Sequence, residues 1–312
     1  MVAGGYGTEC FGRLKTAMLH APVDSIKLVN GQNCRHYLFD AVPDVDKYLE
    51  EHSRYAALLR ANGVEVLELA DHVHEHMGLM RCLPNLAYLH DTAVISRRGA
   101  ILSRMCPGGR QDEDLVVGEA LSRLGIPLFH RFDTYDRFEG MLLLSPQTAF
   151  IADTERHDPG TIERFLPKAL ELYEEVLYAE IPQERRFMHP DMILNRVHTQ
   201  VALIYPPAFL HTWLITRECR REVDIMSYMR SKGVELIVIS GDEQRRWGCS
   251  CVPLEPGLII HYDIALDGKT LSALAANGVK VIGFHPSALL AGGGSLRCLT
   301  LRLFRQPLSD GQ

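Results

Sequence analysis

The sequence Ala276-Asn277-Gly278-Val279-Lys280-Val281 has two close counterparts earlier in the chain. Ala61-Asn62-Gly63-Val64-Glu65-Val66 and Ser231-Lys232-Gly233-Val234-Glu235-Leu236 follow the same order of polar residues, a glycine and an alternating apolar run. Each copy predicts the end of a helix, a glycine cap, and a strand that begins at once. Because the unit recurs, the sequence predicts an α/β fold built from several similar segments.

The rest of the chain continues this alternation of strands and helices. Apolar spacing predicts helices over 43–62, 112–124, 159–173, 219–231 and 271–277. Strands are predicted at 13–20, 64–69, 92–105 (a pair), on both sides of 145–148, and at 127–130, 175–180, 192–196, 200–205, 234–239, 258–262, 279–283 and 299–304. No linker or low-complexity stretch interrupts residues 1–312, which are therefore expected to form one domain.

The composition excludes several classes of protein. The 312 residues are 46% hydrophobic, carry a formal net charge of -6, and contain no long basic run, so a nucleic-acid partner has no electrostatic support. No apolar run is long enough to span a membrane, and the N-terminus does not resemble a signal peptide. We therefore expect a cytoplasmic protein whose eight cysteines are reduced.

Two short motifs suggest metal binding only weakly. Cys249-Ser250-Cys251 has no second pair of Cys or His ligands at the spacing of a zinc site. His72, His74 and His76 alternate in a polar segment that is more typical of a solvated surface than of a metal site. The sequence therefore predicts no metal.

The stretch Gly292-Gly293-Gly294-Ser295-Leu296-Arg297-Cys298 is the strongest candidate for a reactive site. Glycines allow a tight turn and a close approach to a ligand. The positive charge of Arg297 would favour the thiolate form of Cys298, which would then be a nucleophile. A buried structural cysteine after a glycine-rich loop would have the same sequence.

Three polar clusters interrupt apolar surroundings, each where a predicted strand begins or ends. They are Pro84 to Asp91, Arg137 to Gly140 and Phe187 to Asp191. Loops at strand ends commonly carry functional residues in α/β proteins. With Cys298, these clusters supply a nucleophile, a histidine for proton transfer, and carboxylates that would hold a cationic substrate.

In this order along the chain, the motifs resemble those of the guanidino-group-modifying enzymes of the pentein fold, and among them the arginine deiminases most. The resemblance begins at Gly12-Arg13-Leu14-Lys15-Thr16-Ala17-Met18-Leu19-His20, continues through Leu38-Phe39-Asp40, Glu51-His52 and Asn62 to Leu67, and closes on the loop of Cys298. It implies a pentein α/β-propeller, a pseudo-fivefold ring of ββαβ units around a polar channel. It also implies one catalytic domain without the extra helical insertion of arginine deiminases, since the stretch from Phe39 to Pro84 is too short to hold it.

The resemblance assigns catalytic roles to five residues. Cys298 would attack the guanidinium carbon and form a covalent amidino adduct, and His189 would transfer protons. Asp91 and Asp191 would hold the guanidinium nitrogens, and Glu139 would orient His189 or bind a nitrogen. A planar cation suits carboxylates that accept paired hydrogen bonds. Neither a metal nor an organic cofactor is needed.

Further residues are expected to bind the rest of a small guanidino substrate. Asn85, Arg110 and Arg156 match the family's carboxylate-binding groups, and two arginines with an amide would suit a carboxylate. Gly293 and Arg297, on the loop of Cys298, and Leu142 complete the expected substrate-binding set.

Two motifs depart from the family pattern. The family usually reads Glu-Gly-Gly-Asp where this chain has Glu139-Gly140-Met141-Leu142, and Thr-Arg-Asp where it has Leu89-His90-Asp91. Leu142 cannot pair with a substrate ammonium, and losing such a partner costs on the order of 1–3 kcal/mol. Our hypothesis is therefore a guanidino acid whose α-amino group is absent, acylated or altered.

Two other functions remain open from the sequence. An amidinotransferase would use the same residues but pass the amidino group to an amine instead of water. A non-catalytic binding homologue is also compatible with the changes at Leu142 and His90. The resemblance is compatible with a homodimer, and residues 241–256 match a loop that covers the substrate in the family.

Overall fold

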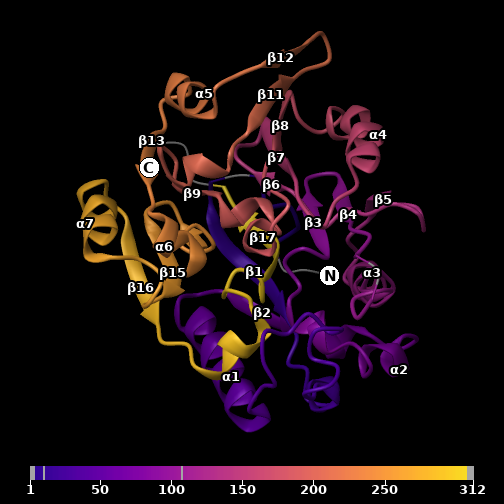
Figure 1. Ribbon diagram of the computed structural model, residues 1–312. Helices are drawn as coiled ribbons and strands as arrows, with labels where there is room; N and C mark the ends of the chain where they lie inside the picture. The colour runs from indigo at the N-terminus through magenta and orange to yellow at the C-terminus, as the bar shows by residue number, and fades with distance from the viewer. Residues whose placement is uncertain (1–3, 10, 107, 308–312) are drawn as a thin grey trace.

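Five β-sheets form the fold, and each contains an antiparallel pair of strands that a third strand joins in parallel (Figure 1). The computed structural model describes residues 4–9, 11–106 and 108–307. In each sheet the two strands of the antiparallel pair are named first and the parallel strand last. The sheets are β17 (Leu301–Gln306), β1 (Arg13–Leu19) and β2 (Glu65–Glu68); β3 (Ala93–Ser96), β4 (Gly99–Leu102) and β5 (Leu128–Arg131); β6 (Leu142–Leu143), β7 (Thr148–Asp153) and β8 (Glu175–Glu180); β9 (Leu194–His198), β10 (Val201–Ile204) and β13 (Glu235–Val238); β14 (Val252–Glu255), β15 (Leu258–Tyr262) and β16 (Lys280–Phe284). The third sheet is extended by β11 (His211–Ile215) and β12 (Arg220–Glu222).

A helix connects the second strand of each sheet to its parallel third strand. These helices are α1 (Val45–Ala61), α3 (Glu113–Arg123), α4 (Pro159–Ala169), α5 (Ile225–Ser231) and α7 (Gly268–Ala276). They lie at the outside of the molecule and follow one another around the strands (Figure 1). The described chain thus contains ββαβ units, and one of them takes its first strand, β17, from the C-terminal end of the chain.

Short helices occupy the connections. They are η1 (Ser25–Leu28), η2 (Leu69–His72), α2 (Met77–Met80), η3 (Pro84–Ala87), η4 (Arg185–Phe187), η5 (Pro190–Met192), η6 (Pro206–Ala208), α6 (Gly241–Arg245) and η7 (Ala288–Gly292). Between β2 and β3 the chain forms only η2, α2 and η3.

The repeated helix ends that the sequence predicts are confirmed. Gly63, Gly233 and Gly278 follow α1, α5 and α7 with φ angles of 79°, 74° and 74°. Residues with a side chain rarely adopt this left-handed conformation, so a glycine at these positions ends the helix and turns the chain into the next strand.

Helix α1 supports the loop of Cys298 as well as the core. Tyr48, Tyr55 and Leu59 are fully buried on one face of this helix, at the spacing expected for an amphipathic helix. Glu51, on the same helix, accepts hydrogen bonds from the backbone N–H groups of Ser287 and Leu289, both at 3.0 Å. These bonds fix the start of η7, which leads directly into the glycine loop.

The structure corrects two predicted helices. The helix expected over 159–173 ends at Ala169, where Leu170 is its C-cap. The segment 219–231 is not helical throughout, because residues 220–222 form β12 and pair with β11. The helix begins at Ile225, after Asp224, whose carboxylate accepts a hydrogen bond from the backbone N–H of Ser227 at 2.8 Å. This N-cap sets the start of α5. Within the described ranges, no helix is both long and apolar enough to cross a membrane.

Candidate active site

The candidate catalytic side chains occupy equivalent places in successive ββαβ units. Each lies two or three residues before the first strand of a sheet: Asp91 before β3, Glu139 before β6, Asp191 before β9 and Cys298 before β17. Because the five first strands begin units of the same kind, residues far apart in sequence come together. Ser250 holds the same place before β14, although no motif in the sequence had singled it out.

Seven of the predicted site residues line one cavity. They are Asn85, Asp91, Arg110, Arg156, His189, Gly293 and Cys298. All of them belong to loops or short 3-10 helices, and the cavity places a thiol, an imidazole, a carboxylate and two guanidinium groups around one space.

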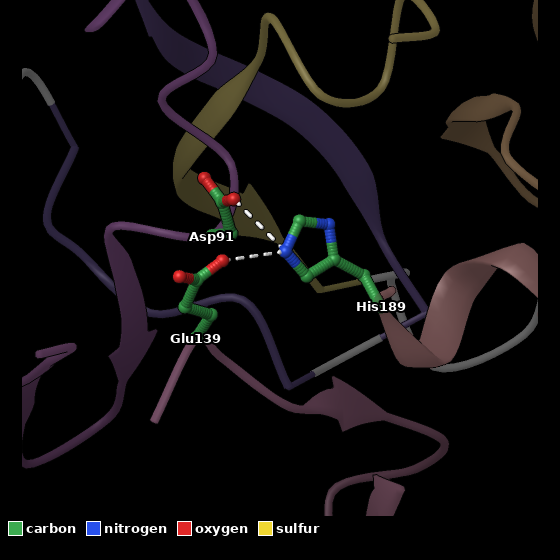
Figure 2. A group of neighbouring side chains, drawn as sticks. All are labelled: Asp91, Glu139 and His189. Carbon is green, nitrogen blue, oxygen red and sulfur yellow. Dashed lines mark hydrogen bonds and ion pairs between the residues drawn. The ribbon is translucent and has the colours of Figure 1, made fainter. Parts of the chain in front are cut away.

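His189 lies between two carboxylates (Figure 2). Its Nε2 atom is 3.0 Å from Oδ2 of Asp91 and 3.0 Å from Oε2 of Glu139. All three side chains are buried, and Cys298 is a further hydrogen-bond partner of His189. The imidazole therefore connects the thiol to both carboxylates.

The charges of this group determine its protonation. Burial alone would lower the pKa of His189, but the charges and hydrogen bonds of its partners, Asp91 foremost, raise that pKa well above its ordinary value. Burial would raise the pKa of Glu139, but Arg156 and His189 lower it to about 2. His189 is thus held as a cation between two carboxylates.

Arg110 neutralises the other side of Asp91. Its guanidinium group contacts both oxygens of Asp91, and its Nε and Nη2 atoms donate to Oε2 of Glu113 at 3.0 and 2.7 Å. A further bond runs from Nη2 to the carbonyl of Tyr88 at 3.0 Å. Burial would lower the pKa of Arg110, but Asp91 and Glu113 raise it well above the ordinary value. Arg110 is therefore engaged by the protein itself.

The two other predicted carboxylate-binding groups also have protein partners. Arg156 donates to Glu155 from Nε at 3.1 Å, and its Nη1 lies 3.5 Å from Oε2 of Glu139. The amide of Asn85 donates to the carbonyl of Tyr37 and so holds the segment that precedes Leu38. These contacts fix both side chains at the wall of the cavity.

A series of hydroxyl groups joins Cys298 to Asp191. Oγ of Ser295 lies 3.4 Å from Sγ of Cys298 and 2.7 Å from Oγ of Ser250, which donates to Oδ2 of Asp191. The other oxygen of Asp191, Oδ1, is buried and has no hydrogen-bond partner among the described residues. A buried acceptor without a partner is costly, so this oxygen is suited to a donor from a ligand.

The three glycines allow the loop to pack against an aromatic ring. A Cβ atom on Gly292 would lie 1.6 Å from the hydroxyl oxygen of Tyr88, and one on Gly294 would lie 2.6 Å from its ring. Gly293 has a φ of 72°. The sequence predicted that glycine permits close approach to a ligand. The structure adds that Gly292 and Gly294 leave room for the side chain of Tyr88.

The comparisons with known proteins agree with this arrangement. The family model described as arginine deiminase matches residues 71–305. The chain belongs to the arginine deiminase family. It is 23% identical to the arginine deiminase of Mycoplasma capricolum over an alignment that covers 96% of each chain. It is also 26% identical to the uncharacterized protein YkgA of Bacillus subtilis, over 95% of this chain and 93% of that one.

A solved structure shows the same fold. The N-terminal domain of ArgZ, determined as a variant covalently bound to a reaction intermediate, superposes with a TM-score of 0.72 and 17% identity. The match covers 93% of this chain and 98% of that domain. The α/β fold is therefore shared along nearly the whole chain.

Four predicted site residues of this arginine deiminase family member, Glu139, Asp191, Leu142 and Arg297, do not line the cavity of Cys298. Leu142 is buried among apolar side chains and borders an adjoining hollow with Glu139 and Asp191. Arg297 points into a third cavity, which shares no described residue with that of Cys298. Their roles toward substrate remain predictions.

The cavity also contains residues to which the sequence analysis assigned no role in the site. They are Leu38, Tyr88, Arg185 and Met188, with Gly292 and Gly294 beside Gly293. Arg185 donates to the carbonyl of Leu38 at 2.7 Å and to Oδ1 of Asp40 at 3.0 Å, which joins two segments at the mouth. None of residues 241–256 lines this cavity, whereas Leu38 does.

The group formed by Asp91, Glu139 and His189 has the residue types of a metal site, since one ligand atom from each lies within 4.8 Å of the others. Arg110 and Arg156 already contact these carboxylates, so a metal ion would compete with two guanidinium groups. The expectation that the site needs no metal or cofactor stays a prediction.

Proposed function

We propose that the protein is a cysteine-dependent hydrolase of a guanidino compound that yields a ureido product and ammonia. The observation that carries the proposal is the single cavity that holds Cys298, the cationic His189 and Asp91. The membership of this protein in the arginine deiminase family supports the same chemistry. The reaction intermediate that is covalently bound in the ArgZ domain supports a covalent route.

In the first step, the thiolate of Cys298 attacks the guanidinium carbon and a C–S bond forms. His189 gives its proton to a terminal nitrogen, the C–N bond breaks, and ammonia leaves. The substrate carbon remains bound to Sγ as a cationic amidino adduct. Asp91 and the unpartnered oxygen of Asp191 accept hydrogen bonds from the remaining guanidinium nitrogens.

In the second step, a water molecule attacks the same carbon and His189, now neutral, takes one of its protons. The C–S bond breaks, Cys298 recovers its thiolate, and the second water proton leaves to solvent as the ureido group forms. Glu139, 3.0 Å from Nε2, orients the imidazole in both steps. Its low pKa keeps it ionised, so that it stabilises each imidazolium state.

The far end of the substrate is an acid group bound by Asn85 and Arg156, because the donors of Arg110 are already taken by Asp91, Glu113 and the carbonyl of Tyr88. Arg185 adds a positive charge at the mouth of the cavity. Since Leu142 is apolar and buried, it offers no partner to an ammonium group. We infer a guanidino acid whose α-amino group is absent, acylated or altered.

We also propose that the five ββαβ units form a pentein α/β-propeller with pseudo-fivefold symmetry, and that residues 1–312 make one catalytic domain. Equivalent places for the site residues before the first strands support this symmetry. The alignment with the Mycoplasma capricolum enzyme spans 391 positions, so that relative has segments this chain lacks. The short connection between β2 and β3 is consistent with the loss of a helical insertion there. A homodimer remains a prediction.

The test measures ammonia and ureido product from L-arginine, N-acetylarginine, guanidinobutyrate, agmatine and methylated arginines. The variants are Cys298→Ala and, as a matched control, Cys219→Ala, since Cys219 is free and exposed. Turnover that is lost only in Cys298→Ala supports the proposal. The hypothesis on the α-amino group is wrong if kcat/KM for L-arginine clearly exceeds that for the other acids. Product that forms only with glycine, lysine or hydroxylamine as acceptor indicates an amidinotransferase, and an inert Cys298 indicates a binding protein.

A further inference from the structure

A second polar cavity lies apart from that of Cys298 and is lined by four arginines. Its lining includes Arg196, Arg297, Arg302 and Arg305. The arginines come from β9, β17 and the loop of Cys298, and β14 with Thr8, Glu9 and Phe11 contributes to the wall. Nothing in the proposed reaction uses this cavity.

The described lining carries more positive than negative charge. Against the four arginines, it has two carboxylates, Glu9 and Glu255. Glu9 accepts a hydrogen bond from the backbone of Arg97, and Glu255 lies 3.7 Å from Arg13. The chain has a net charge of -6, but the described lining of this cavity contains more guanidinium groups than carboxylates.

For several guanidinium nitrogens of these arginines, the described part of the chain offers no hydrogen-bond partner. Arg297 is only 1% exposed, and its Nη1 donates to Asn195 and to the carbonyl of Cys251, both at 3.2 Å. Its Nη2 atom is buried without an acceptor among the described residues. The same holds for the Nε atoms of Arg196 and Arg302. Buried donors without acceptors are rare and costly.

The protonation equilibria of the cluster agree with this geometry. Burial and the charges of Arg297 and Arg305 lower the pKa of Arg302 well below its ordinary value. Burial likewise lowers the pKa of Arg196 to about 10. A bound anion would offset both effects, because it supplies opposite charge and hydrogen-bond acceptors together.

We propose that this cavity binds a small multivalent oxyanion, a phosphate or a dicarboxylate. Guanidinium groups donate paired hydrogen bonds to both kinds of anion. The free N–H groups of Arg297, Arg196 and Arg302 are the donors. Arg305 contributes charge, while its Nη1 donates to the carbonyl of Gly12 at 2.8 Å.

The test is calorimetric titration with inorganic phosphate and, separately, with succinate, at an ionic strength held constant with sodium chloride. Arg297 is left intact because its Nε atom lies 3.5 Å from Oδ2 of Asp191. The variants are Arg302→Gln and Arg196→Gln, with exposed Arg221→Gln as the matched control. Arg156→Gln reports on binding in the cavity of Cys298. Circular dichroism checks that each variant is folded. If only one of Arg302→Gln and Arg196→Gln is folded, that variant alone tests the proposal.

The wild-type protein is expected to bind at least one of the two anions saturably. Arg302→Gln and Arg196→Gln should weaken binding about tenfold or more, as expected for a lost charge-assisted bond. Arg221→Gln and Arg156→Gln should leave it unchanged. The preferred anion identifies a phosphate or a carboxylate ligand. The proposal is overturned if the wild type binds neither anion saturably, or if Arg156→Gln weakens binding while Arg302→Gln and Arg196→Gln do not.

Discussion

The guanidinium group of Arg110 lies against both carboxylate oxygens of Asp91, with Nη2 3.0 Å from Oδ1 and Nη1 in contact with Oδ2. This is the paired contact that a substrate guanidinium would make with the same residue. Asp91 also contacts His189, so three of its roughly four acceptor positions are taken. Substrate must therefore share Asp91 with Arg110 or displace it.

Loss of Arg110 is expected to destabilise the fold as well as the site. Arg110→Gln leaves Asp91 and Glu113 buried without their cation, and removal of one partner of a buried ion pair costs about 3–5 kcal/mol. Urea unfolding measures this loss, with Arg221→Gln as an exposed control.

The double variant Arg110→Gln/Glu113→Gln separates ion pairing from lost packing. Burial raises the pKa of Glu113 to about 8 even beside Arg110, so without Arg110 this group is a neutral acid. The double variant should recover part of the free energy of unfolding, because it replaces a buried acid group that has lost its hydrogen-bond donor. Equal stability of the single and double variants would show that the pairing contributes little.

The protonation of His189 predicts how stability depends on pH. Its folded-state pKa lies well above the ordinary value of 6.5, because the opposing effect of burial is outweighed by Asp91 and its other partners. The folded state therefore binds this proton more tightly than the unfolded state does. The resulting stabilisation is fully present below the unfolded pKa and is lost as pH rises through the folded pKa.

The measurement is the free energy of unfolding of the wild type and of His189→Asn between about pH 7.5 and 10. The advantage of the wild type should shrink as pH rises. His261→Asn is the control, since burial lowers the pKa of His261 to about 4 and its contribution is constant in that range. A difference between wild type and His189→Asn that does not change with pH would contradict the assignment.

Local patterns in the sequence predicted the parts of the structure that depend on local physics. The helix ends at Gly63, Gly233 and Gly278 follow from the backbone conformation that glycine permits, and the structure bears them out. The position of Cys298 beside His189 was predicted from the order of family motifs. Local signals were misread where Asp224 caps a helix later than the apolar spacing suggested, and where α4 ends at Ala169 instead of continuing to residue 173.

Contacts between distant segments could not be predicted in this way. Ser250 donates to Asp191 across 59 residues of sequence, and Arg185 reaches Leu38 across 147. A serine or arginine in a loop carries no signal of such a partner. The place of Ser250 two residues before β14, equivalent to that of Asp91 before β3, would have singled it out once the five units were aligned.

Ser295 is predicted to tune the reactivity of Cys298. Its hydroxyl lies 3.4 Å from Sγ and is joined through Ser250 to Asp191. A hydrogen bond to a charged group contributes about 1.5–3 kcal/mol, so Ser295→Ala should lower kcat/KM by about tenfold or more. The rate of alkylation of Cys298 by iodoacetamide, measured against pH, should shift as well. An unchanged alkylation profile would argue against this role, and exposed Ser227→Ala is the control.

At Gly293, the effect of backbone conformation on a substitution can be separated by experiment from the effect of neighbouring side chains. Gly293 and Gly233 have nearly equal φ angles, 72° and 74°, so an alanine at either position meets the same backbone strain. A Cβ on Gly293 would lie 2.5 Å from Oδ2 of Asp40, whereas a Cβ on Gly233 meets nothing within 4 Å. Gly233→Ala should therefore cost about 1 kcal/mol of stability and leave turnover unchanged. Gly293→Ala should cost more and also lower kcat/KM, because relief of the clash moves the loop of Cys298 or the segment of Asp40 that Arg185 holds at the mouth. Equal losses of stability in the two variants, with turnover intact in both, would show that the contact with Asp40 does not position the loop.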